Sequence, residues 1–249
     1  MTPVSILFNF CLLLITLPAI AQVDANYCGS LPNGFGPFDY RPERDTGNHG
    51  DGDHKYKLKL VEGAHFTREV ELLIRGHRSG NDPGGDIDYT LRAFPNHHRA
   101  LMAVMRYGEK KASKRPAGLK YDVECYFERA IRFAADDAIA RIIYATYFDK
   151  QKRTPEAISQ LEQATRIARD NAFTHYNIGL AYLDMKVYDK ALIQAHRALA
   201  LGFERTQLRD MLEKAGHWKD PATEPAATTA NSPPATPSFP AASSPVADQ

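Results

Sequence analysis

Small apolar, large apolar and polar residues repeat every 34 positions across residues 138–205. Ala157 and Ala191 form one such equivalent pair. Ala191, Ala195 and Ala198 are spaced by four and three residues, so on a helix they form one stripe. Small side chains on this stripe let a second helix approach closely. The pattern predicts antiparallel helix pairs that stack on neighbouring pairs, because each pair leaves apolar surface uncovered.

The spacing resembles the tetratricopeptide repeat, a helix–turn–helix unit of the same length. A unit that begins at Ala172 matches the large, small and alanine positions of that repeat at Ile178, Gly179, Tyr182, Ala191 and Ala198. The unit that begins at Ala138 matches at Tyr144, Ala145, Phe148, Ala157, Leu161 and Ala164. Two positions depart from the repeat, because His175 replaces an aromatic residue and Phe203 replaces a proline.

The same register extends towards the N-terminus. Phe127 and Ala130 lie one repeat period before Leu161 and Ala164, which predicts a second helix over 121–134 with a partner over 98–106. The link over 107–120 is longer than the repeat requires, and it contains Lys110, Lys111, Lys114 and Arg115. It is either a solvated surface loop or a basic docking loop for an acidic partner.

The resemblance implies an all-α fold, a right-handed superhelical array of antiparallel helix pairs with about three repeat units and a capping helix. We expect units near 98–137, 138–171 and 172–205 and a cap over 206–217, within a repeat domain over 84–218. The irregular N-terminal arm over 22–83 is expected to hold one helix over 66–76. A short strand over 55–60 is also expected in the arm, because polar and apolar residues alternate there.

The two ends of the chain differ in composition from the repeats. Residues 6–17 are apolar and Ala19-Ile20-Ala21 is a small-x-small cleavage pattern, so residues 1–21 are predicted to be a secretory signal peptide. An uncleaved membrane anchor is the alternative. Residues 219–249 are rich in Pro, Ala, Ser and Thr, which predicts a disordered tail. The chain also resembles exported bacterial tetratricopeptide proteins, so we expect a periplasmic or secreted protein.

Removal of the signal peptide leaves two cysteines, Cys28 and Cys125. An even number of cysteines in an oxidising compartment favours a disulfide. Cys125 falls on the second helix of its unit, on the side away from the alanine stripe. A bond between Cys28 and Cys125 would therefore hold the arm on the outer surface and leave the inner groove open.

Candidate chemistry is sparse. The formal net charge is +1 and no basic stripe is present, which argues against nucleic acid as a partner. One loop is a weak metal-site candidate through His49, Asp51, Asp53 and His54, although its spacing fits no calcium loop and no H-E-x-x-H helix. No nucleophile elbow, phosphate loop or dinucleotide fingerprint occurs in the sequence. We therefore expect neither enzyme activity nor a cofactor.

The resemblance implies a concave groove lined by the first helix of each unit. Carried onto this sequence, it assigns the groove to Arg99, Met102, Arg106, Ile142, Thr146, Phe173, Tyr176, Asn177, Leu180 and Leu183. This groove would be cationic near its N-terminal end and apolar near its C-terminal end. Such a surface suits a peptide with an acidic part and an apolar anchor. The alternative is that the arm or the cap covers these side chains.

These expectations favour an exported scaffold that binds a protein or peptide partner in its groove. Two other functions stay open. One is a metal-handling or hydrolytic protein that uses the His49–His54 loop, and the other is a part of an envelope complex that binds no ligand of its own.

Overall fold

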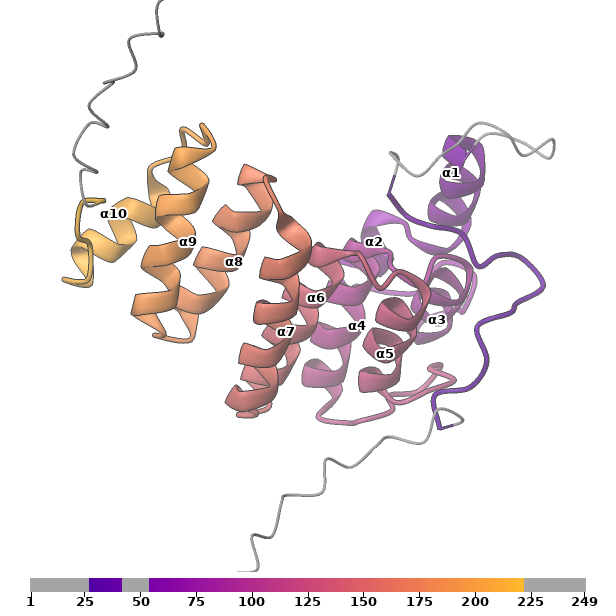
Figure 1. The fold of residues 1–249 in the computed structure, drawn as a ribbon. Helices are drawn as coiled ribbons and strands as arrows, with labels where there is room; N and C mark the ends of the chain where they lie inside the picture. Colours follow the sequence, from indigo (N-terminus) through magenta and orange to yellow (C-terminus); the bar gives the residue numbers. More distant parts are fainter. Residues whose placement is uncertain (1–26, 42–53, 222–249) are drawn as a thin grey trace, which may run out of the picture. The chain divides into compact units, whose positions relative to one another are not determined.

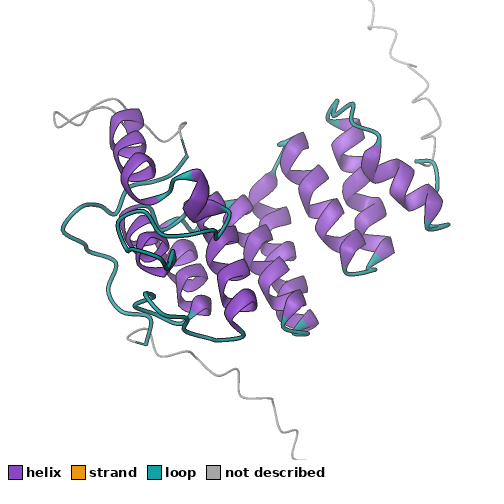
Figure 2. Cartoon of the chain, turned by 180° about the vertical axis from the view of Figure 1, so that it is seen from behind, coloured by secondary structure: helices purple, strands orange, loops and turns teal. Residues whose placement is uncertain are grey.

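The computed structural model describes residues 27–41 and 54–221, and every regular element in these residues is a helix (Figures 1 and 2). The ten helices of this part are α1 (His54–His65), α2 (Arg68–Glu71), α3 (Gly84–Ala93), α4 (His98–Lys111), α5 (Val123–Phe133), α6 (Ala138–Lys150), α7 (Thr154–Ala168), α8 (Ala172–Asp184), α9 (Tyr188–Ala200) and α10 (Gln207–Lys214). The chain divides into two units, Met1–Trp218 and Lys219–Gln249, and all ten helices belong to the first. None of them is long and apolar enough to span a bilayer.

The tightest helix pairs are α6 with α7 and α8 with α9, and α7 in turn packs on α8 (Figure 1). The alanine stripes explain this packing. Ala157 and Ala164 on α7, and Ala191 and Ala198 on α9, are almost completely buried. α4 and α5 form a looser pair before them. The structure confirms the expected all-α array of helix pairs, and its fold is a tetratricopeptide-like helical repeat.

The first helix of each pair begins at a side chain that caps its N-terminus. The side chains of His97, Asp137 and Asn171 accept hydrogen bonds from backbone N–H groups in the first turns of α4, α6 and α8. Such caps satisfy donors that the helix itself leaves unpaired. The repeated caps fix where each first helix starts, and therefore align the three helices.

Aromatic rings join the first two pairs. The Phe127 ring on α5 stacks on the Tyr144 ring of α6 at a centroid distance of 5.1 Å, and Tyr144 stacks on Phe148 at 4.2 Å. Tyr144 also donates its hydroxyl to Glu128 of α5 at 2.6 Å, so this buried tyrosine has a polar partner. Burial first, and then the Glu128 carboxylate, raise the pKa of Tyr144 well above its usual value.

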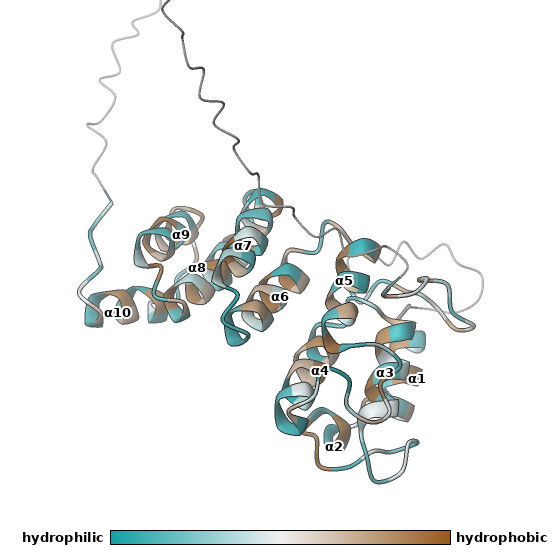
Figure 3. Cartoon of the chain, turned by 90° about the horizontal axis from the view of Figure 1, so that it is seen from below, coloured by the Kyte–Doolittle hydropathy of each residue, from teal (hydrophilic) through white to brown (hydrophobic). Residues whose placement is uncertain are grey.

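The helix α10 closes the C-terminal end of the array, beside α8 and α9 (Figure 3). Its Leu208 and Leu212 side chains are buried. Gly179 on α8 makes this contact possible, because a Cβ at that position would overlap the Leu208 side chain. The glycine therefore serves the docking of the cap as well as the approach of α9.

The link between α4 and α5 is not a simple solvated loop. Pro116 and Leu119 are buried in it, and the backbone N–H of Lys120 donates to Asp88 of α3 at 3.2 Å. Gly84 of α3 lies so close to the carbonyl of Ala117 that no side chain fits between them. The link packs on α3 and keeps only part of its length, including Lys114 and Arg115, in solvent.

Two expectations for the N-terminal arm need correction. Residues 55–60 belong to α1 and not to a strand, because Lys57 and Val61, one helical turn apart, are both buried. The Lys57 ammonium lies 4.7 Å from the centre of the Phe38 ring, so its apolar stem covers the arm. The helix expected over 66–76 is only the short α2, and Leu73 follows it with a positive φ of 57°.

Within the arm, residues 27–41 follow the outer side of α5 and reach the turn between α3 and α4. The Cys28 and Cys125 sulfur atoms are 2.12 Å apart. The buried Arg129 side chain of α5 donates to the carbonyls of Cys28 and Ser30 at 3.1 and 2.6 Å. Further along, the Phe38 N–H donates to the Ala93 carbonyl at 2.8 Å. These contacts hold the arm whether or not the two sulfurs are bonded, so the disulfide itself stays a prediction.

Candidate peptide-binding surface

The first helices of the three pairs, α4, α6 and α8, pack side by side and present a common face. The ten side chains assigned to the groove come from these helices, but the structure places them in three different environments. Some are held by the arm, some are buried in the array, and some are open to solvent.

At the N-terminal end of this face the arm makes polar contacts with α4, although Arg99 and Met102 stay exposed. Arg99 Nε donates to the Glu71 carboxylate at 2.9 Å, and Arg99 Nη1 donates to Glu62 at 3.2 Å. The hydrogen bond from Arg99 lowers the pKa of Glu71. Arg106 Nη2 donates to the backbone carbonyl of Glu71 at 3.3 Å. α2 thus contacts Arg99 and Arg106 of α4, as the alternative of an arm on the face implies, and an open groove at this end stays a prediction.

Three of the assigned side chains are buried by the array itself. Ile142, Tyr176 and Leu183 are each less than a tenth exposed. The Tyr176 ring lies 4.6 Å from the Phe203 ring, and its hydroxyl donates to Gln207 of α10 at 3.1 Å. These residues join neighbouring helices and are not accessible to a partner.

The open part of the face lies on α6 and α8, with one further residue on α4. Phe173 is 52% exposed and Met102 is 43% exposed. Thr146, Asn177 and Leu180 are half-buried between them. Thr146 and Asn177 donate to carbonyls one turn earlier in their own helices, at 3.1 and 2.7 Å, so their polar groups are already satisfied in part. We call Thr146, Phe173, Asn177 and Leu180 the open groove.

A pocket of about 380 Å³ adjoins the open groove at the N-terminal ends of α6 and α8. Its apolar lining comes from Ile139, Ile167, Ala168 and Phe173, and its polar lining includes His98, Asp137, Asn171 and two arm residues, Tyr40 and Arg41. The arm thus forms one wall of the pocket, which sequence reasoning did not anticipate.

A buried hydrogen-bond network fixes that wall. Asp137 accepts from Asn96 Nδ2 at 2.8 Å, from His98 Nε2 at 2.9 Å and from the Ala140 N–H at 3.0 Å. Burial opposes ionisation of Asp137, but the His98 and backbone hydrogen bonds prevail and lower its pKa. Asn96 Oδ1 in turn accepts from the Tyr40 N–H at 2.9 Å. A signal for this role was present in the sequence, since Asp137 lies one repeat period before the cap residue Asn171.

The weak metal-site candidate cannot be judged on its geometry. His49, Asp51 and Asp53 lie outside the described residues, and His54 is the first residue of α1. Among the residues that the structure describes, no group of three or more His, Cys, Asp or Glu side chains is placed to hold a metal ion.

Comparison with known proteins adds little to this description. No model of a protein family matches the sequence, and no curated protein is similar to it. Among solved structures, the chain is similar to a crystal structure of MamA, with 19% sequence identity over 66% of this chain and 89% of that chain. The TM-score of this match is 0.33, so the likeness carries no argument about function. The repeat fold is therefore inferred from the helix packing of this chain, and the candidate surface from its side chains.

Proposed function

We propose that this protein is an exported scaffold that binds a peptide segment of a partner protein on the open groove. Repeat arrays of this kind offer long surfaces built from equivalent helices, and such surfaces suit extended or helical peptides. Export rests on the composition of residues 1–21 and is part of the proposal.

The exposure of Phe173 is the observation that carries the proposal. A phenylalanine that is 52% exposed on the common face, next to half-buried Leu180 and a pocket with apolar walls, gains from being covered by a partner. Large apolar side chains beside a pocket are typical anchors of peptide recognition. The Phe203 ring lies 6.1 Å from the Phe173 ring.

The test is affinity purification from an envelope fraction with the full chain as bait. We expect Phe173→Asp to lose the partner, because it places a charge where the apolar contact forms. The matched control is Ile193→Asp on α9. Ile193 is 62% exposed, and it lies one repeat period beyond Ser159, on the second helix of its pair.

The two variants separate the proposal from a purely structural role in a complex. A groove binder keeps its partner in Ile193→Asp and loses it in Phe173→Asp. An assembly part that docks through its second helices shows the opposite pattern, and that result would overturn the proposal. Both variants change an exposed side chain, so circular dichroism should show equal helix content.

A further inference from the structure

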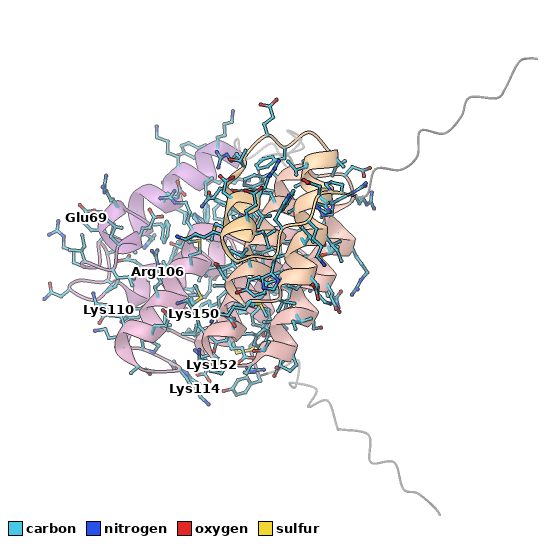
Figure 4. All side chains as sticks on the ribbon, turned by 90° about the vertical axis from the view of Figure 1, so that its left-hand side faces the viewer. Glu69, Arg106, Lys110, Lys114, Lys150 and Lys152 are labelled. Carbon is cyan, nitrogen blue, oxygen red and sulfur yellow. A yellow bond between two sulfur atoms is a disulfide. The ribbon has the colours of Figure 1, made fainter. Side chains whose placement is uncertain are left out.

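Five cationic side chains gather where α4 and α6 end and where the link to α5 begins (Figure 4). They are Arg106, Lys110, Lys114, Lys150 and Lys152, and we call them the cationic surface. Four of the five are exposed, and Arg106 is half-buried. Arg106 and Lys110 stand one turn apart on α4, one and two turns after the exposed Met102.

The structure holds two of these cations in place without neutralising them directly. Arg106 donates to the backbone carbonyls of Glu71 and Met102, both at 3.3 Å. Lys110 Nζ donates to the carbonyl of Leu73 at 2.8 Å. The Glu71 carboxylate accepts from Arg99, and the charge of Arg106 also helps to lower the pKa of Glu71. The end of α2 therefore orients these two cations, while their charge remains available to a ligand.

The other three cations are only partly compensated, since the charge of Lys114 helps to lower the pKa of Asp122 without a direct contact. The ammonium groups of Lys114 and Lys152 make no hydrogen bond or ion pair with any described residue. Lys150 pairs with Glu109 at 3.1 Å, and both partners are partly exposed. An exposed pair of this kind is weak and exchanges readily with another carboxylate.

Stabilisation of the fold explains only part of this surface. Lys110 and Lys150 lie in the last turns of their helices, where a positive charge interacts favourably with the helix dipole. That effect does not account for Arg106 inside α4, or for Lys114 and Lys152 in the turns that follow the helices.

We infer that the cationic surface binds an acidic peptide segment, whose carboxylates contact Arg106, Lys110, Lys114 and Lys152 and whose apolar side chain covers Met102. This inference rests on the proposed function, since the surface belongs to the same helix face. A peptide fits better than a nucleic acid, because the carboxylates of Glu109 and Asp122 lie beside Lys150 and Lys114 and would repel an unbroken row of phosphates. Acidic side chains that alternate with neutral ones avoid this repulsion.

The probe is a fluorescent synthetic peptide in which one leucine is followed by alternating glutamates and serines. It is titrated with the full chain at low and at physiological ionic strength. The control peptide has glutamine in place of glutamate. Single-stranded DNA and vesicles of anionic phospholipid serve as competing polyanions. We expect binding of the acidic peptide only, with an affinity that falls as salt rises.

The variant is Lys114→Glu with Lys152→Glu, which reverses two charges that form no ion pair with a described residue. We expect affinity for the acidic peptide to fall roughly tenfold, since each reversal replaces an attraction by a repulsion. The matched control is Lys186→Glu with Lys214→Glu. Lys186 lies one repeat period after Lys152 and has a similar positive φ, 60° against 61°, so it changes the net charge equally at an equivalent turn.

Each outcome bears on the inference. Loss of affinity in the Lys114/Lys152 variant alone supports it. No binding of the acidic peptide, equal losses in both variants, or tighter binding of DNA or vesicles would overturn it. If the peptide fails while Phe173→Asp still loses the envelope partner, the proposed function stands and only the acidic chemistry of the partner is refuted.

Discussion

Replacement of both Cys28 and Cys125 by serine tests how the N-terminal arm is held to the array. The two residues are separated by 97 positions, and the bond would join the start of the described arm to α5. The change keeps the size of both side chains nearly constant. The variant therefore leaves no cavity, and comparison with the reduced wild type separates the loss of the covalent link from the burial of two serine hydroxyls.

The magnitude follows from the length of the closed loop. Chain-entropy arguments give about 4–5 kcal/mol of free energy of unfolding for a loop of this size, and measured values are usually smaller. In the folded state the arm keeps the hydrogen bonds from Arg129 and the bond from Phe38 to Ala93 after the link is removed. The loss should therefore arise in the unfolded chain, and we expect the free energy of unfolding to fall by about 3 kcal/mol.

The assay is equilibrium unfolding in urea of the wild type, the reduced wild type and the double serine variant, combined with a thiol titration. Without the link the unfolded chain expands, so the dependence on urea should also steepen. We expect no free thiol in a chain that lacks Cys11 and one in a chain that retains it. Two further free thiols in the denatured, unreduced protein, or equal midpoints for all three samples, would refute the reasoning.

Three further predictions concern the packing of the array and its response to pH. Leu208→Ala should lower the free energy of unfolding by about 2–4 kcal/mol, since the side chain is buried over Gly179; Leu199→Ala, at an exposed position, is the control in urea unfolding. Ala191→Leu should lower the free energy of unfolding by about 1–3 kcal/mol or more, and with it the melting temperature, because no space remains between α8 and α9. The control, Ala200→Leu on the exposed side of α9, should leave both unchanged. His97 is buried and its Nδ1 accepts from the Ala100 N–H at 3.2 Å, which requires the neutral ring, and burial lowers its pKa below the ordinary 6.5. As the pH falls, the unfolded chain protonates His97 before the folded chain does, so the wild type loses stability below about pH 6.5. His97→Asn keeps a capping acceptor and has no such proton. The difference in free energy of unfolding between the two proteins should therefore shrink below about pH 6.5. A difference that is constant from pH 7 to about 5 would contradict this assignment.

The sequence was most informative where the repeat is regular. Ala157, Ala191 and Gly179 predicted a close helix pair, because only small side chains permit that approach, and the structure has such pairs. The period also located the start of α6 and α8, since a capping residue precedes each. Steric rules of this kind act between neighbouring residues, so a single sequence suffices to apply them.

The sequence was least informative where contacts join distant segments. The alternation in residues 55–60 predicted a strand, whereas the burial of Lys57 and Val61, with Lys57 against the Phe38 ring, accompanies the helix α1. The burial of Tyr176 under α10 depends on Gln207 and Phe203, which no local pattern connects with it. The wall that Tyr40 adds to the pocket depends on Asn96 and could not be predicted either. In each case the deciding partner lies on another element.

The departures of the first pair from the regular repeat explain why the common face is divided. The turns after α6 and α8 are short, whereas the link after α4 packs on α3 and brings α5 to the start of the arm. On the same first pair, α2 lies on α4, and its Glu71 carboxylate accepts from Arg99. Arg106 and Lys110 donate to the backbone carbonyls of Glu71 and Leu73, at and just after the end of α2. The first pair thus carries the contacts with the arm and the charged surface, whereas the open groove lies on the first helices of the regular repeats.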